Sequence, residues 1–251
     1  MVHFVGAGPG APDLITLRGA ALLQAADVII YAGSLVNPAL LARKKSGCAV
    51  YNSAKMHLDE VIAVMVRAET EGKTTVRLHT GDASIYGAIR EQMDELDARG
   101  IAYDVTPGVS SFCGAAASLC AEYTLPGVSQ SLVITRLSGR TAVPERESLR
   151  AFAAHGASMA LFLSAGMLER VQQELLAGGC GADTPAALVY KATWPEEKIV
   201  HCTVGTLSRA GAEAGISKTA LVLVGGFLAA KGERSRLYDP TFTTEFREGT
   251  K

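Results

Sequence analysis

Short apolar segments alternate along the chain with segments whose apolar residues recur at helical spacing. Between Leu58 and Val66, apolar residues repeat every three or four positions and charged residues fill the intervening ones, which predicts an amphipathic helix. In the first half, the apolar segments that read as strands run from Val2 to Val5, Val28 to Tyr31, Ala49 to Tyr51, Thr75 to His79 and Ala102 to Val105. Such alternation predicts a mostly parallel sheet with helices on both faces.

The pattern changes near Pro126, and the polar stretch from Ser138 to Glu147 has neither helical nor strand periodicity. Beyond it, further strands are expected at Leu132 to Thr135, Met159 to Leu163, Ala186 to Tyr190, Ile199 to Val204 and Ala220 to Val224. We therefore predict two α/β/α domains, residues 1–125 with an open parallel sheet and residues 126–251 with a mixed sheet. The last residues, from Pro240, are expected to form an irregular tail.

Composition narrows the classes of partner. The chain of 251 residues has 24 Lys and Arg against 25 Asp and Glu, so no overall positive field attracts nucleic acid or an anionic membrane. The five Cys are far apart, and the five His show no zinc spacing beside them, which predicts no metal site. The chain opens on a strand-like segment, and its apolar runs are shorter than the roughly 20 residues that span a bilayer. We therefore expect a cytoplasmic protein.

Three loops rich in small residues follow strands of the first predicted sheet: Gly6 to Ala11, Thr80 to Gly87, and Thr106 to Ser111. The carboxyl edge of an open parallel sheet is where ligands usually bind, which favours a binding site at these loops. Local structural roles remain open for two of the residues. Asp82 could cap the next helix through its backbone N–H groups instead of binding a ligand, and Ser110 could be the N-cap of the following helix.

The first loop has the spacing of a dinucleotide-binding fingerprint, but its surroundings argue against one. Pro9 and Pro12 delay the next helix to about Asp13 to Thr16, and the second strand ends in Tyr31-Ala32-Gly33 without an acidic residue. A nicotinamide-dependent oxidoreductase is therefore a rival hypothesis rather than the leading one. A ligand-binding module without catalysis is a second rival.

Taken together and in order, the motifs carry a family resemblance over nearly the whole chain. They read GAGPG, LHTGDASIYGA, VTPGVSSFCGAA, QSLVITRLSGRTAVPE, VYKATWPEEKIV and SRLYDPTFTTEFR. This combination resembles the tetrapyrrole (class III) S-adenosylmethionine-dependent methyltransferases. The resemblance implies an active site in the cleft between two α/β domains, S-adenosyl-L-methionine as cofactor with S-adenosyl-L-homocysteine as product, and a homodimer. The implied reaction is methylation of a corrin precursor in cobalamin biosynthesis, at carbon 11 of cobalt-precorrin-4, with metal-free precorrin-4 or another ring carbon as alternatives.

The resemblance also implies which residues contact the cofactor. Along the methionine and ribose part of the cofactor, the resemblance implies Thr80, Gly81, Asp82 and Ile85, with Ser110 and Ser111 on the opposite wall. Pro9 is expected near the sulfonium. The residues expected around the adenine are Leu163, Ala192, Thr219 and Ala220. The glycine-rich loop, with Gly8 and Gly10, is expected to face the tetrapyrrole. Two positions depart from the family pattern: Ala11 stands where an Asp is common, and Ala83 where a Pro is common.

The substrate carries many carboxylates, for which Arg is the natural partner because its guanidinium binds a carboxylate through two parallel hydrogen bonds. Arg136 and Arg140 are the preferred pair, with Lys55, His57, Lys191 and Lys198 as further substrate-binding candidates. Trp194, the only tryptophan, could pack in the core or line the substrate site. Transfer of a sulfonium methyl needs orientation rather than a nucleophilic side chain, so the sequence identifies no catalytic base.

Overall fold

The computed structural model describes residues 1–33, 35–233 and 235–250, which form two compact units. Unit 1 comprises Met1–Ala115 and Lys191–Glu196, and unit 2 comprises Ala116–Tyr190 and Glu197–Lys251. The division therefore lies upstream of the junction expected near Pro126, and one short segment of the second half belongs to unit 1.

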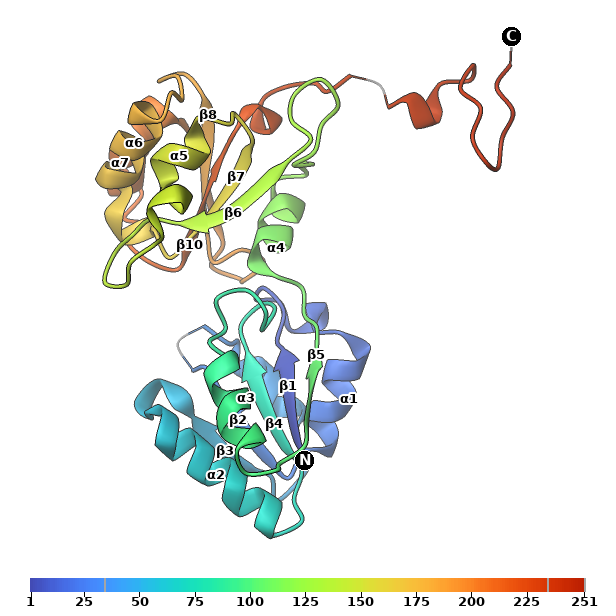
Figure 1. The fold of residues 1–251 in the computed structure, drawn as a ribbon, viewed down its shortest axis with the longest axis vertical. Helices are drawn as coiled ribbons and strands as arrows, with labels where there is room; N and C mark the ends of the chain where they lie inside the picture. Colours follow the sequence, from blue (N-terminus) through green and yellow to red (C-terminus); the bar gives the residue numbers. More distant parts are fainter. Residues whose placement is uncertain (34, 234, 251) are drawn as a thin grey trace. The chain divides into compact units, whose positions relative to one another are not determined.

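Unit 1 is built on an all-parallel sheet in the order β3-β2-β4-β1-β5. Its strands are β1 (Val2–Gly6), β2 (Val28–Tyr31), β3 (Ala49–Asn52), β4 (Thr75–His79) and β5 (Tyr103–Thr106). Helices α2 (Leu58–Thr70) and α3 (Arg90–Asp97) cover one face, where Met65 and Leu96 pack with Phe4. Helix α1 (Leu17–Ala25) covers the other face (Figure 1). The predicted parallel sheet and its five strands are confirmed.

Local signals explain where these helices begin. The side chain of Thr16 accepts a hydrogen bond from the Gly19 amide at 3.1 Å, so α1 begins only after Pro12, as its prolines predict. At α2, the Glu60 carboxylate reaches back to the His57 amide at 3.0 Å. Helix α4 (Ser111–Ser118) follows β5 and contains the division between the units.

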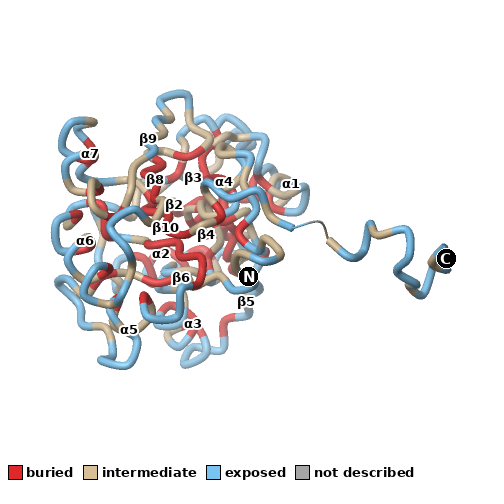
Figure 2. The backbone as a smooth tube through the Cα atoms, turned by 90° about the horizontal axis from the view of Figure 1, so that it is seen from above, coloured by how far each residue is buried: buried red, intermediate tan, exposed pale blue. Residues whose placement is uncertain are grey.

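Unit 2 contains a mixed sheet, as predicted. Its strand order is β6-β7-β10-β8-β9. Only β6 and β7 are parallel neighbours, and the other pairs are antiparallel. Its strands are β6 (Leu132–Arg136), β7 (Ser158–Phe162), β8 (Pro185–Tyr190), β9 (Lys198–Thr203) and β10 (Ala220–Val224), and its helices are α5 (Leu149–Ala153), α6 (Leu168–Ala177) and α7 (Leu207–Glu213). In both units the central strands are buried while helices expose their outer sides (Figure 2).

Short helical turns join these elements, and the tail is irregular. The turns are η1 (Pro12–Leu14), η2 (Pro38–Arg43), η3 (Ser53–Lys55), η4 (Glu145–Glu147), η5 (Ala165–Met167), η6 (Val204–Thr206), η7 (Gly226–Leu228) and η8 (Arg236–Tyr238). In the tail, Nη2 of Arg247 donates to the carbonyl oxygens of Leu237, Asp239 and Phe242. Among the described residues, no helix has both the length and the apolar character needed to cross a membrane.

The central strand of unit 1 buries three polar side chains on one face: Thr75, Arg77 and His79. Nε of Arg77 donates to Oε1 of Gln92 at 2.9 Å, and Nη1 donates to the Ile30 carbonyl at 3.3 Å. Burial lowers the pKa of Arg77 to about 10. Burial, with the nearby positive charge of Arg77, lowers the pKa of His79 to about 3, so His79 is neutral in the folded protein near neutral pH.

The neutral state of His79 makes stability depend on pH. Below about pH 6.5 the unfolded chain binds a proton at this histidine, whereas the folded protein does so only near pH 3. We therefore expect the free energy of unfolding to fall by about 1.4 kcal/mol per pH unit as the pH drops below 6.5. Urea titrations between pH 6.5 and 4.5 measure this slope. His79→Leu should flatten it, and the same substitution at the exposed His155 should leave it in place; an unchanged slope in His79→Leu contradicts the assignment.

Candidate functional site

The three small-residue loops of unit 1 meet at the carboxyl edge of the parallel sheet. The amide of Gly8 donates to the Gly81 carbonyl at 3.2 Å, and the amide of Gly81 donates to the Gly8 carbonyl at 2.9 Å. The loop after β1 is thus paired by its backbone with the loop after β4. The first and second loops predicted to share this edge are directly bonded to each other.

The third loop approaches so closely that side chains are excluded. A Cβ atom added to Gly108 would lie 2.2 Å from the Gly81 carbonyl oxygen, and one added to Gly6 would lie 2.6 Å from the Cα of Gly108. Both separations are shorter than any ordinary contact, so only glycine allows these backbones to touch. Gly6, Gly81 and Gly108, one from each loop, form what we call the glycine junction.

Asp82 fastens the second loop to the third. One of its carboxylate oxygens accepts the Gly108 amide at 2.8 Å, and the other accepts the Ser84 amide at 2.8 Å and the Ser84 hydroxyl. Partial burial of the carboxylate raises its pKa, but these hydrogen bonds outweigh burial and hold the pKa of Asp82 below its ordinary value. Asp82 is therefore an anion whose main contacts are internal to the protein.

Several cofactor candidates of unit 1 lie around the glycine junction. Oγ1 of Thr80 is buried and has no hydrogen-bond partner among the described residues. Ser110 is buried at the start of α4, where its carbonyl accepts the amides of Cys113 and Gly114. Pro9, Gly81, Ile85 and Ser111 belong to the same loops. A buried hydroxyl without a hydrogen-bond partner among the described residues fits a polar ligand at this edge.

The cofactor candidates of unit 2 gather at one edge of its mixed sheet. The pairing of β7 with β10 places residue 163 opposite Ala220, and the pairing of β8 with β10 places Tyr190 on the other side of Ala220. Leu163 is 66% exposed and has φ +53°, and Thr219 has φ +54°. A large apolar side chain that is both exposed and left-handed is costly, and such strain clusters at functional sites. Ala192 belongs to the 191–196 segment of unit 1.

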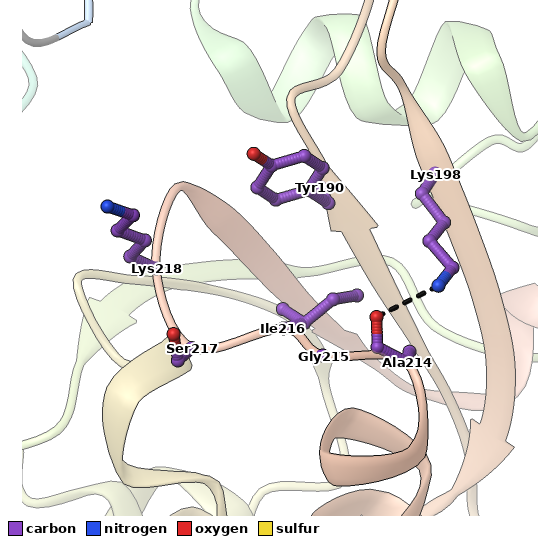
Figure 3. Close-up of a pocket in the computed structure, with 7 residues that line it drawn as sticks. All are labelled: Tyr190, Lys198, Ala214, Gly215, Ile216, Ser217 and Lys218. Atoms are coloured by element: carbon purple, nitrogen blue, oxygen red, sulfur yellow. Dashed lines mark hydrogen bonds between the residues drawn. The ribbon is translucent and has the colours of Figure 1, made fainter.

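Beside this edge, unit 2 contains a pocket of about 220 Å³ (Figure 3). It is lined by Tyr190, Lys198 and the five residues from Ala214 to Lys218, and Nζ of Lys198 donates to the Ala214 carbonyl at 2.8 Å. The volume is below the roughly 300 to 1,000 Å³ of whole ligand sites, so the pocket suits part of a ligand rather than a tetrapyrrole. Tyr190 was not among the predicted site residues, whereas Lys198 is one of the basic candidates for a substrate carboxylate.

The substrate candidates have different environments. The guanidinium of Arg136 donates to the carbonyls of Thr141 at 3.1 Å and Ala142 at 2.8 Å, so it closes its own loop. Arg140, in that loop, is exposed and forms no hydrogen bond or ion pair with any residue the structure describes. Lys55 is exposed just after β3, at the same sheet edge as the glycine junction. Nζ of Lys191 lies 3.6 Å from Oε2 of Glu196 and 5.0 Å from the centre of the Trp194 ring.

Three residues that support this site were not singled out from the sequence. Gly108 supplies the amide that Asp82 binds, and Asn37 and Thr193 hydrogen-bond the backbone of the first loop. The TPG sequence around Gly108 signals a turn, and Asn37 precedes a proline as helix-capping residues do. Neither signal reveals the distant partner.

The glycine junction predicts a specific stability effect. Gly108→Ala places a methyl group against the Gly81 carbonyl, and we expect it to lower the free energy of unfolding by about 1 to 3 kcal/mol through overpacking. Urea denaturation of the variant and the parent measures the loss. Gly181→Ala is the matched control, because a Cβ there meets only Thr184 Oγ1 at 3.6 Å. Equal effects of the two substitutions are incompatible with the junction.

The chain matches the family model of tetrapyrrole (corrin/porphyrin) methylases over residues 1–208. It is 52% identical to a cobalt-precorrin-4 C(11)-methyltransferase of Methanocaldococcus jannaschii over all of this chain and 97% of that protein. It also resembles the X-ray structure of a cobalt-precorrin-4 methyltransferase, with TM-score 0.89 and 47% identity over 91% of this chain and 96% of that one. The uroporphyrin-III C-methyltransferase of Thermus thermophilus, complexed with S-adenosylhomocysteine, has TM-score 0.77 and 27% identity over 93% and 95% of the two chains. The match to the family model and the full-length similarity show that this chain belongs to the tetrapyrrole methylase family.

Proposed function

We propose that this protein transfers the methyl group of S-adenosyl-L-methionine to carbon 11 of cobalt-precorrin-4 in cobalamin biosynthesis. The observation that carries the proposal is the 52% identity, over the whole chain, to a protein named for this activity. The glycine junction supports it, because three loops are fastened together at the sheet edge where ligands of open parallel sheets bind. Cobalt is part of the substrate in this proposal.

The proposed cofactor contacts in unit 1 involve the loops of the glycine junction. The Thr80 hydroxyl, which has no hydrogen-bond partner among the described residues, and the backbone of Gly81 and Asp82 would bind polar groups of the methionine and ribose part. Ile85, Ser110 and Ser111 complete this set, and Pro9 is assigned to the sulfonium side of the cofactor. The binding of S-adenosylhomocysteine by the Thermus thermophilus relative supports this choice of cofactor.

In unit 2 we assign the adenine to the edge formed by Leu163, Thr219 and Ala220. Leu163 has a left-handed backbone conformation and exposes its apolar side chain to water, which is unfavourable. A flat heterocycle such as adenine would cover this side chain. Ala192 in unit 1 is assigned to the same part of the cofactor. These assignments concern each unit by itself.

The chemistry leaves the protein a positioning task. The sulfonium of S-adenosylmethionine supplies an already activated methyl group, so the side chains need to orient the two reactants and exclude water. Asp82 is not assigned as a general base, because both carboxylate oxygens bind the protein and its pKa is lowered. Its role is to hold the second and third loops at a fixed separation.

Among the basic residues, Arg140 is our choice for binding a substrate carboxylate. It is exposed and has no partner in the described chain, whereas Arg136 is already bonded to the loop that carries Arg140. Arg136 therefore supports the loop, and Arg140, Lys55 and Lys191 meet the substrate. Gly8 and Gly10, in the loop after β1, are assigned to the tetrapyrrole side. We further propose that the protein acts in the cytoplasm as a homodimer. Sedimentation equilibrium tests the dimer, for which we expect a mass twice that of the chain.

The direct test supplies the purified protein with S-adenosylmethionine carrying a labelled methyl group and either cobalt-precorrin-4 or metal-free precorrin-4. Label at carbon 11 of the cobalt form, located by NMR, is the expected result. Transfer to metal-free precorrin-4 alone would show that the proposed cobalt-containing acceptor is wrong. Label at another ring carbon would show that the proposed methylation position is wrong. Transfer to neither substrate overturns the proposed function.

Gly81→Arg should abolish binding of S-adenosylhomocysteine, because a long side chain at this position fills the space where the cofactor approaches the backbone. Isothermal titration calorimetry measures the affinity, and circular dichroism verifies that the variant folds. Unchanged affinity in a folded variant places the cofactor elsewhere.

Arg140→Ala should reduce kcat/KM for the tetrapyrrole by about 10- to 150-fold and leave S-adenosylhomocysteine binding intact, since one charge-assisted hydrogen bond is lost. Arg140→Lys should restore part of the loss, because an ammonium keeps the charge but not the paired geometry. Steady-state kinetics at saturating cofactor separate the variants. A change smaller than twofold in Arg140→Ala identifies a solvated surface charge instead.

A further inference from the structure

The segment 191–196 carries the only tryptophan of the chain and packs it against the glycine-rich loop after β1. Nε1 of Trp194 donates a hydrogen bond to the Pro9 carbonyl at 3.2 Å. The ring lies so close to the loop that a Cβ atom on Gly10 would be 2.1 Å from the ring carbon Cδ1. Trp194 thus contacts two consecutive residues of the loop, one by a polar bond and one by direct packing.

The rest of the loop is fastened in the same manner. Nδ2 of Asn37 donates to the Gly10 carbonyl at 2.9 Å, and the Ala11 amide donates to Oγ1 of Thr193 at 2.9 Å. Gly8 is already paired with Gly81. Every residue from Gly8 to Ala11 therefore has a backbone group bonded to another part of unit 1, and two of these bonds come from neighbouring side chains of the 191–196 segment.

The 191–196 segment is itself held in an unusual conformation. Lys191 has φ +46° and Thr193 has φ +68°, both left-handed for residues that carry a β-carbon. The Lys191 ammonium lies over the indole ring at 5.0 Å and 3.6 Å from the Glu196 carboxylate. Conformations of this kind persist only where the surroundings impose them, and they concentrate at functional sites.

From these contacts we infer that Trp194 is a positioning residue for methyl transfer. It fixes Pro9 and Gly10 through its hydrogen bond and its packing, and it touches neither reactant. The inference rests on the proposed function, which assigns Pro9 to the sulfonium side of the cofactor and Gly10 to the tetrapyrrole. Because the loop orients the reactants, loss of its anchor should slow turnover more than it weakens binding.

The decisive variant is Trp194→Phe, which keeps an aromatic ring and removes the Nε1 donor. We expect kcat to fall by about 2- to 10-fold, the loss that one neutral hydrogen bond accounts for. KM for the tetrapyrrole, the affinity for S-adenosylhomocysteine and the thermal midpoint should all stay close to the parent values. This separation of kcat from binding and stability distinguishes positioning from a purely structural role.

Tyr103→Phe is the matched control. It also removes one aromatic hydrogen bond, from the Tyr103 hydroxyl to Oδ2 of Asp97 at 3.1 Å, but at the start of β5, the opposite edge of the same sheet. Its kcat should match the parent. Parental kcat in Trp194→Phe overturns the inference, and so does a Trp194→Phe protein that fails to fold or loses stability and cofactor affinity in parallel.

A double-mutant cycle tests the anchor without using activity. Gly10→Ala should destabilise the parent, since the added methyl group meets the Trp194 ring, and should cost clearly less in a Trp194→Ala background. The Ala192 carbonyl, 2.8 Å from the same Cβ position, makes the relief partial. Equal costs in both backgrounds show that the ring does not hold the loop. If the cycle shows coupling but the parent protein methylates neither substrate, the proposed function is wrong, while the anchoring of the loop by Trp194 still holds.

Discussion

The arrangement of unit 1 depends on one steric condition, the direct contact of three backbones at the glycine junction. Gly6 ends β1, Gly81 follows β4 and Gly108 follows β5, and their chains are closer than any β-carbon allows. Once they touch, the Gly8 and Gly81 amides and carbonyls are in range of each other, and the Asp82 carboxylate reaches the Gly108 amide. The edge of the sheet is thereby shaped by backbone, and the side chains that remain there, such as Thr80 and Ser110, are the small hydroxyl residues.

The fold could be derived from the sequence because its signals are local. Alternation of apolar strands and amphipathic helices is enough to place the ten strands found in the described residues and to separate a parallel sheet from a mixed one. Thr16 and Glu60 mark helix starts through bonds that span three residues. The three loops of the site were likewise predicted to lie together, because parallel strands have their carboxyl ends at a single edge.

The contacts that the sequence did not reveal join distant residues. Nothing near Arg136 in the chain shows that its guanidinium turns back to the Thr141 carbonyl. The unit boundary within α4, and the placement of 191–196 in unit 1, likewise depend on packing that no local pattern encodes. Arg77 and His79 are buried in β4, although their polar side chains alternate with apolar ones as in a strand with one exposed face. This alternation does not reveal that both faces of the sheet are covered at β4.

The anchoring of the first loop by Trp194 has a consequence for the order in which the protein is made. Pro9 is synthesised before its hydrogen-bonding partner, which follows 185 positions later. The parallel sheet of unit 1 has all its strands once Thr106 has been synthesised, yet the loop at its edge lacks its indole and its Thr193 hydroxyl until β8 is complete. Contacts of such long sequence separation form late, because chain entropy opposes them until the rest is in place. During synthesis, the protein therefore acquires its scaffold first and the final geometry of its glycine-rich loop among the last steps.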